Sequence, residues 1–212
     1  FFRHYFAENE KITFLFKKKT SQFLLKEFHT FLKWFMNVQI IEETEDKIVL
    51  KIFTIDDLSI EECAKRIYFL SLNMIDEIGN KERMQELRDS MTKFFYMLVM
   101  QVRRFLLHGK YFEQNQISLL KAMDYRMITE RCRRIGNLAI MIDEIKDTKL
   151  EDFLKEVKEY YKVTFSCFLN KNSVRVLTLR KEGQELRRKY ENLQKRYWKS
   201  RDIEKFQKHH NI

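Results

Sequence analysis

The chain has 212 residues, of which 44% are hydrophobic and 34% are charged. This balance excludes an intrinsically disordered chain, and no apolar run approaches the roughly 20 residues that a membrane-spanning helix needs. The net charge is +10, and most of it belongs to one end, because residues 171–212 hold 13 basic and five acidic side chains. The length allows one sizeable core or two small ones.

Residues 1–57 predict a small α+β domain. The β-branched and aromatic content of 12–16 indicates a short strand, and apolar residues at helical spacing over 20–36 indicate an amphipathic helix. The runs VQIIEE and KIVLKIF follow, joined by three polar residues as in a hairpin. Together these elements predict a small sheet with a helix on one face. Because the chain opens on FFRHYF rather than on Met, we expect a further N-terminal part.

From residue 58 onwards the pattern is helical, and the whole chain is therefore expected to be mainly α. The sequence has no Pro and only four Gly, which permits long helices. Ser59 with Glu62, and Thr148 with Glu151, have the spacing of capping boxes. We expect helices over 59–78, 81–108, 116–147, 148–168 and 174–198, with a short further helix from residue 202. Short turns between them predict a three-helix bundle over 58–147 and a second, incomplete bundle over 148–212.

The cysteines and histidines form no recognisable site. Cys63, Cys132 and Cys167 are far apart and lie on apolar helical faces, so we expect buried, reduced thiols in a cytoplasmic protein. His4, His29 and His108 are isolated, and surface or core packing is their expected role. The adjacent pair His209 and His210 lies close to the C-terminal end. We find neither a glycine-rich phosphate loop nor a catalytic Ser, His and Asp set, and expect no enzyme activity and no cofactor.

One helical segment, residues 123–146, carries a family resemblance. Within it, RRIGNLAIMIDE resembles the third helix of a PhoU repeat, which usually reads acid, Arg, Ile, Gly or Ala, Asp, and later Ile-Ala-Glu. The segment LSIEECAKRIYFLSLNMIDE resembles the first helix of that repeat, and FFYMLVMQVRR resembles the second. VQIIEETEDKIVLK resembles the hairpin that precedes the repeat in archaeal phosphate uptake regulators with an AbrB-like DNA-binding domain. The resemblance covers about residues 3–147.

This resemblance implies PhoU-like three-helix bundles and a regulator of phosphate uptake and transcription. In the family, acids four apart on the second and third helices help to bind a metal cluster. Here those positions hold Arg88 and Thr92 on the second helix and Arg133 and Asn137 on the third. Because a metal cation needs several converging carboxylates and Arg repels it, we expect no metal. Gly136 is retained, where a small residue lets two helices approach closely.

The basic C-terminal helix has two kinds of residue. A seam with three- and four-residue spacing is expected to pack on another helix, and comprises Val176, Leu179, Gly183, Leu186, Tyr190, Leu193 and Tyr197. The candidate polyanion-binding residues lie off that seam and are Arg180, Arg187, Arg188, Lys195, Arg196, Lys199 and Arg201. A phosphate backbone binds a surface with such an excess of positive charge, because the binding releases counterions from the nucleic acid.

Two functions remain open from the sequence. The first is a PhoU-like regulator that acts through protein contacts or self-association, and possibly through DNA. The second is a nucleic-acid-binding or ribonucleoprotein-associated (ribosome-associated) module, in which the bundle is a scaffold and the basic arm grips phosphates of RNA or DNA. An acidic protein surface is also allowed as the partner of the arm.

Overall fold

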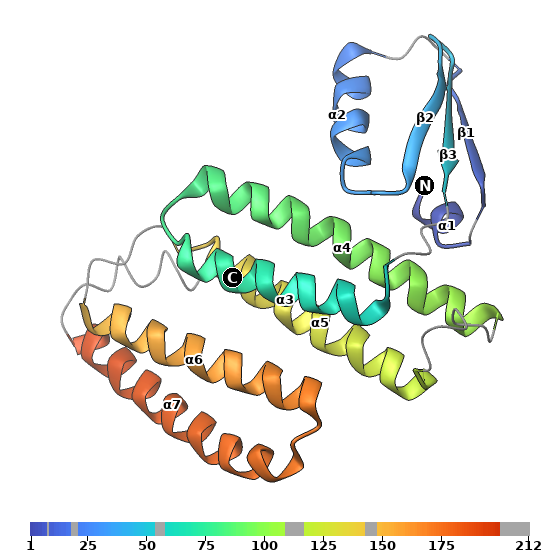
Figure 1. The fold of residues 1–212 in the computed structure, drawn as a ribbon. Coiled ribbons are helices and arrows are strands. Elements are labelled where there is room, and N and C mark those ends of the chain that lie inside the picture. Colours follow the sequence, from blue (N-terminus) through green and yellow to red (C-terminus); the bar gives the residue numbers. More distant parts are fainter. Residues whose placement is uncertain (8, 18–20, 54–57, 109–116, 143–147, 200–212) are drawn as a thin grey trace. The chain divides into compact units, whose positions relative to one another are not determined.

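The computed structural model describes residues 1–7, 9–17, 21–53, 58–108, 117–142 and 148–199. In that part the chain is mainly helical, with a small antiparallel sheet near its beginning (Figure 1). The elements in order are α1 (Phe2–Tyr5), β1 (Lys11–Leu15), α2 (Gln22–Leu32), β2 (Val38–Glu43), β3 (Lys47–Ile52), α3 (Ile60–Asp76), α4 (Lys81–His108), α5 (Leu119–Ala139), α6 (Thr148–Asn170) and α7 (Ser173–Lys199). The predicted fold class, a small α+β part followed by long helices, is confirmed.

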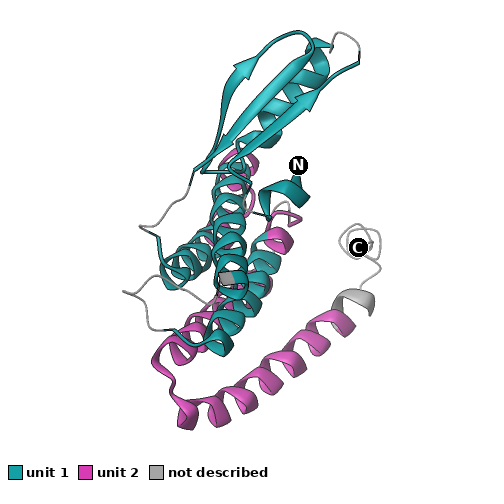
Figure 2. Cartoon of the chain, turned by 90° about the vertical axis from the view of Figure 1, so that its right-hand side faces the viewer, with its two compact units in different colours: residues 1–73, 85–136 teal, residues 74–84, 137–212 magenta. Residues whose placement is uncertain are grey.

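The chain divides into two compact units, which Figure 2 shows in different colours. The first unit comprises Phe1–Asn73 and Gln85–Gly136, and so holds the sheet and most of α3, α4 and α5. The second comprises Met74–Met84 and Asn137–Ile212, and its described helices are chiefly α6 and α7. Each unit is treated by itself below.

The sheet of the first unit has the order β1-β3-β2, and both pairings are antiparallel. The central strand β3 buries Ile48, Leu50 and Ile52 on the face that α2 covers, which follows from the two-residue period of a strand. A register shift between Ile40 and Glu42 interrupts the pairing of the edge strand β2. Such an irregularity, with charged residues beside it, makes an edge unsuitable for pairing with another chain.

Aromatic packing joins this sheet domain to α4 within the first unit. The rings of Phe35 and Tyr96 are stacked, with centroids 4.9 Å apart and planes inclined by 14°. Tyr5 is fully buried beside them, and its hydroxyl donates a 2.8 Å hydrogen bond to Asn37 Oδ1. Asn37 Nδ2 in turn donates to the carbonyl oxygen of Phe53 at 2.8 Å. The sheet, α1 and α4 therefore share one core.

Helices α3, α4 and α5 form the bundle of the first unit. The predicted capping box of α3 is confirmed, because Glu62 N donates to Ser59 Oγ at 3.0 Å and Ser59 N to Glu62 Oε2 at 2.8 Å. Buried Gln101 of α4 donates to the carbonyl oxygen of Leu58 and accepts from Cys63 Sγ. Burial raises the pKa of Cys63 to about 12, so this thiol stays protonated. All three cysteines are buried and free, as predicted.

Two sequence expectations about helices need correction. The helix predicted over 116–147 is shorter, since α5 ends at Ala139. Met141 N and Ile142 N donate to carbonyls three residues earlier, which is the tightened last turn common at helix ends. The short helix α1 was not predicted. The helix expected from residue 202 lies outside the described residues.

Replacing Tyr5 by Phe tests the buried hydrogen bond of the first unit. The variant leaves Asn37 Oδ1 buried without its donor, and we expect the free energy of unfolding to fall by about 1–2 kcal/mol. Chemical denaturation measures it. The control is Phe23→Leu, at an exposed ring of the same unit, which should change stability by less than about 0.5 kcal/mol. Equal stability of Tyr5→Phe and the wild type would contradict this account.

Candidate functional site

The candidate polyanion-binding residues lie on α7, where the structure describes four of the seven. Arg180, Arg187, Arg188 and Lys195 are all exposed. Arg196 and Lys199 belong to α7, but their side chains lie outside the described part, and Arg201 lies wholly outside the described residues.

The packing of α7 on α6 decides which way these side chains point. Leu179 is buried, and Gly183 lies so close to Tyr160 that a Cβ at residue 183 would be 2.6 Å from Tyr160 Oη. The rings of Tyr190 and Phe153 are stacked, with centroids 6.4 Å apart. The predicted seam is thus confirmed at Leu179, Gly183 and Tyr190. It is wrong at Val176, which is 51% exposed.

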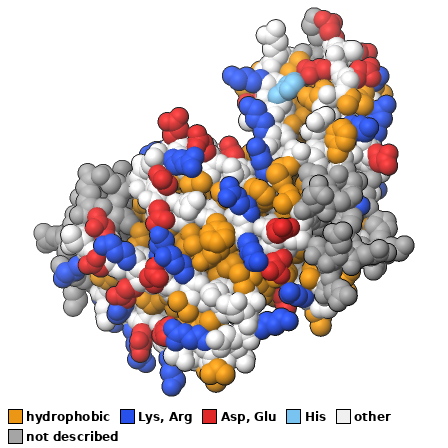
Figure 3. All heavy atoms as spheres, viewed as in Figure 1, with side chains coloured by type: hydrophobic (Ala, Val, Ile, Leu, Met, Phe, Trp, Pro, Cys, Tyr) orange, Lys and Arg blue, Asp and Glu red, His pale blue; other side chains and the backbone are white. Residues whose placement is uncertain are grey.

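Three cations of α7 are neutralised within the second unit. Arg175 binds Glu182 with two hydrogen bonds, Nη1 to Oε1 at 2.7 Å and Nη2 to Oε2 at 3.1 Å. Arg187 Nε lies 3.2 Å from Glu191 Oε1, and Lys189 Nζ lies 2.6 Å from Glu156 Oε2 on α6. The lower left of Figure 3, where α6 and α7 lie, accordingly shows basic and acidic side chains next to one another. Arg187, one of the predicted residues, is therefore paired with an acid.

Four other cations of α7 are exposed and have no acidic partner among the described residues: Arg180, Lys181, Arg188 and Lys195. Lys181, Arg188 and Lys195 are seven residues apart, so they follow one line along the helix over roughly 21 Å. We call these three residues the basic stripe, and Arg180 flanks it. The sequence prediction missed Lys181, although its seven-residue spacing was a usable signal.

Acidic side chains near the stripe line a groove between α6 and α7. Glu156 and Glu159 of α6 line this groove of about 300 Å³, together with Glu182 and Glu185 of α7. Glu185 is three or four residues from two members of the stripe, yet it makes no ion pair within 4.0 Å with either. No three or more His, Cys, Asp or Glu side chains of the described residues converge as metal ligands.

At the four positions where the expected resemblance to PhoU repeats would place metal-binding acids, the structure shows other interactions. Arg88 is exposed on α4, and the hydroxyl of Thr92 donates to the Arg88 carbonyl at 2.9 Å. The guanidinium of Arg133 lies over the ring of Phe95, with its carbon 4.4 Å from the ring centroid. Asn137 is partly buried and belongs to the second unit. None of these four side chains is a carboxylate.

A second polar cluster, which the sequence did not reveal, joins α3 and α5. The Tyr125 hydroxyl donates a 2.6 Å hydrogen bond to Glu61 Oε2, and Lys65 Nζ lies 2.9 Å from Glu61 Oε1. These bonds, with Lys121 at 3.6 Å, lower the pKa of Glu61 to about 2. The two bonded residues are 64 positions apart in the sequence, so no local spacing predicts that they pair. The cluster connects the two helices and holds no nucleophile.

The histidines lie at the surface where the structure describes their side chains. His29 Nε2 lies 3.0 Å from Glu43 Oε2, and His4 Nδ1 lies 2.8 Å from Asn9 Nδ2. The side chain of His108, and the pair His209 and His210, lie outside the described part.

No protein-family model, curated protein or solved structure matches this chain. Among the described residues, no helix combines the length and the apolar character that crossing a membrane requires.

The Tyr125 to Glu61 bond predicts how stability depends on pH. Because folding lowers the pKa of Glu61 from 4.5 to about 2, this carboxylate stabilises the fold above pH 4.5, and the stabilisation is lost as pH falls towards 2. Tyr125→Phe should lower the free energy of unfolding at pH 6 by about 1 kcal/mol, a value reduced for the partial exposure of Glu61. The difference from the wild type should shrink towards pH 2.5.

Urea denaturation between pH 2.5 and 7 checks this prediction. Glu61→Gln is the companion variant, in which this part of the pH dependence should vanish altogether. If Tyr125→Phe keeps the full pH dependence of the wild type, the hydroxyl does not set the pKa of Glu61.

Proposed function

We propose that this protein is a non-enzymatic, cytoplasmic regulator that acts by binding partners, and that one partner is a nucleic acid bound along α7. The observation that carries the proposal is the basic stripe, whose three side chains are exposed and lack acidic partners among the described residues. Arg180 adds a fourth such charge beside the stripe.

The geometry of the stripe suits a phosphate backbone. Seven residues of helix correspond to about 10.5 Å, so the stripe presents three charges at regular intervals along one helix. A nucleic acid offers regularly spaced phosphates along a line, and each phosphate that pairs with Lys or Arg releases condensed counterions. Such contacts position a nucleic acid without reading its sequence. An acidic protein surface is the alternative partner, and we favour nucleic acid because its backbone repeats one charge at regular intervals.

The regulatory part of the proposal draws on the resemblance to PhoU repeats in archaeal phosphate uptake regulators. The bundle of α3, α4 and α5, with a small sheet domain before it, has the element order that this resemblance implies. Arg88, Thr92 and Arg133 stand at positions where that family has acids, which favours signalling through the protein surface without a metal cluster. Protein contacts or self-association of the bundles would transmit the signal.

Removing the charges of the stripe tests the nucleic-acid proposal. The variant replaces Lys181, Arg188 and Lys195 by Gln, and the matched control replaces Lys11, Lys26 and Lys33, three exposed lysines of the sheet domain. Both variants lower the net charge by the same amount. We expect the stripe variant to lose at least about tenfold in affinity for a random-sequence duplex DNA or single-stranded RNA. The slope of log K against log salt should become shallower by roughly two to three.

Fluorescence anisotropy between 50 and 300 mM salt measures both quantities for both nucleic acids. The control should bind nearly as the wild type does. Equal losses in the two variants, or no binding by the wild-type chain, would contradict the proposal.

Metal analysis of the purified wild-type protein tests the other part. Because the family's acidic positions hold Arg and Thr in the first unit, we expect less than about 0.1 equivalents of iron, zinc or magnesium after dialysis. Inductively coupled plasma mass spectrometry makes the measurement. A stoichiometric amount of any of these metals would show that signalling without a bound metal is the wrong proposal.

A further inference from the structure

Two arginines of α5 lie over one aromatic ring of α4. The guanidinium carbons of Arg126 and Arg133 are 4.7 and 4.4 Å from the centroid of the Phe95 ring. Phe95 is only 5% exposed, so the ring forms an apolar floor. The two arginines are seven residues apart, on the same side of α5, and both retain about a third of their side-chain exposure.

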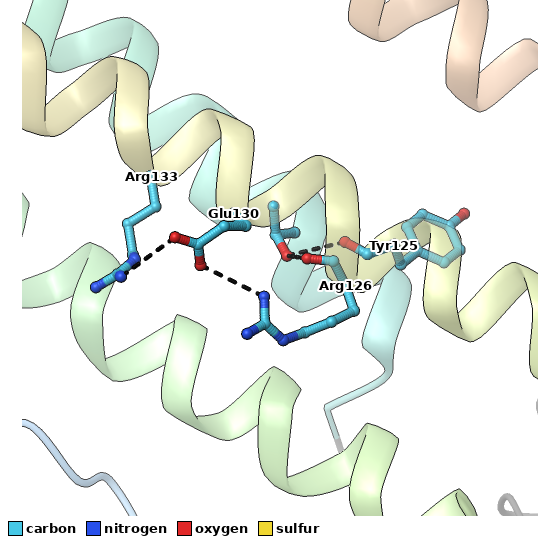
Figure 4. Close-up of polar contacts among 5 residues, drawn as sticks. Tyr125, Arg126, Glu130 and Arg133 are labelled. Carbon is cyan, nitrogen blue, oxygen red and sulfur yellow. Dashed lines mark hydrogen bonds and ion pairs between the residues drawn. The ribbon is translucent and has the colours of Figure 1, made fainter.

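The hydrogen-bond donors of this pair are poorly satisfied. Glu130 lies between the two arginines and is the one carboxylate paired with them among the described residues (Figure 4). Its oxygens are 3.4 Å from Arg126 Nη1 and 3.4 Å from Arg133 Nη2, well beyond the 2.7–2.9 Å typical of charge-assisted hydrogen bonds. Of the described side chains, only Arg133 has a buried nitrogen or oxygen without a hydrogen-bond partner, its Nε.

The charges of the cluster are also unbalanced. Two guanidinium groups share one carboxylate, which leaves a net charge of +1 next to an apolar floor. Electrostatic attraction is stronger there than in open water because the ring replaces polarisable solvent on one side. The planar forks of two arginines together offer ten N–H donors, of which Glu130 engages two at long distance. The cluster therefore has both spare positive charge and spare donors.

We propose that Arg126 and Arg133 form a binding site for an oxyanion of the phosphate class, either inorganic phosphate or a phosphate monoester. The oxygens of such a tetrahedral anion can accept hydrogen bonds from both guanidinium groups at once, including one from Arg133 Nε. The site lies in the first unit, and the basic stripe belongs to the second. The proposal is thus independent of nucleic-acid binding by α7.

Glu130 has a distinctive role in this site. Its carboxylate orients both guanidinium groups, but its negative charge also opposes an incoming anion. Glu130→Gln should therefore tighten phosphate binding, by roughly three- to tenfold, because it removes a like charge next to the bound anion. A purely structural ion-pair network would respond differently, since the same variant would only loosen it.

Site-resolved titration of the full chain tests this proposal. Arginine Nε–Hε resonances are followed by NMR while inorganic phosphate or phenyl phosphate replaces chloride at constant ionic strength. We expect a saturable shift of the Arg133 resonance with at least one of the two anions. Comparison of the two titrations shows whether the site binds inorganic phosphate or a phosphate monoester. Arg126→Gln and Arg133→Gln should each weaken binding at least about tenfold.

The matched controls are Arg131→Gln and Arg134→Gln, two exposed arginines of the same helix, which should leave the dissociation constant within about twofold. The stripe variant Lys181→Gln, Arg188→Gln, Lys195→Gln should also leave it unchanged. The proposal is overturned if neither anion gives a saturable shift, if the controls lose as much affinity as Arg126→Gln, or if Glu130→Gln weakens binding.

Discussion

The pairing of α7 with α6 is the interaction on which the functional account depends. Leu179 and Gly183 fix the packed side of α7, and Gly183 allows Tyr160 to approach closely. This packing brings Lys189 next to Glu156 on α6, and the two side chains form an ion pair across the groove. Lys181, Arg188 and Lys195 are left on an exposed line without such partners among the described residues. Part of the charge excess of the sequence thus becomes a line of exposed cations along α7.

A second group of cations lies on α5. Arg133 and Arg126 lie over the ring of Phe95 and share the carboxylate of Glu130. We propose that this pair attracts anions, whereas the resemblance to PhoU repeats would place acids for a metal on the same helix. Buried apolar side chains, among them Met91 and Leu98 of α4, hold the bundle together.

Much of the fold follows from local sequence signals, and the site only in part. The capping box at Ser59 and the strand in KIVLKIF follow from local patterns, and both are confirmed. Long-range choices were not accessible: the order β1-β3-β2 and the bond from Tyr125 to Glu61 depend on how distant segments meet. The basic character of α7 was legible from composition. Which cations stay unpaired could not be predicted, because it depends on side-chain geometry within α7 and on the acids of α6 across the groove.

The central claim is that α7 contacts nucleic acid through its exposed cations. The most direct measurement is ultraviolet cross-linking of the wild-type chain to uniformly labelled RNA and to DNA, with cross-linked peptides identified by mass spectrometry. The account predicts that the cross-links concentrate in peptides from Ser173–Lys199, around Lys181, Arg188 and Lys195. Cross-links confined to the sheet domain, with none on α7, would contradict it.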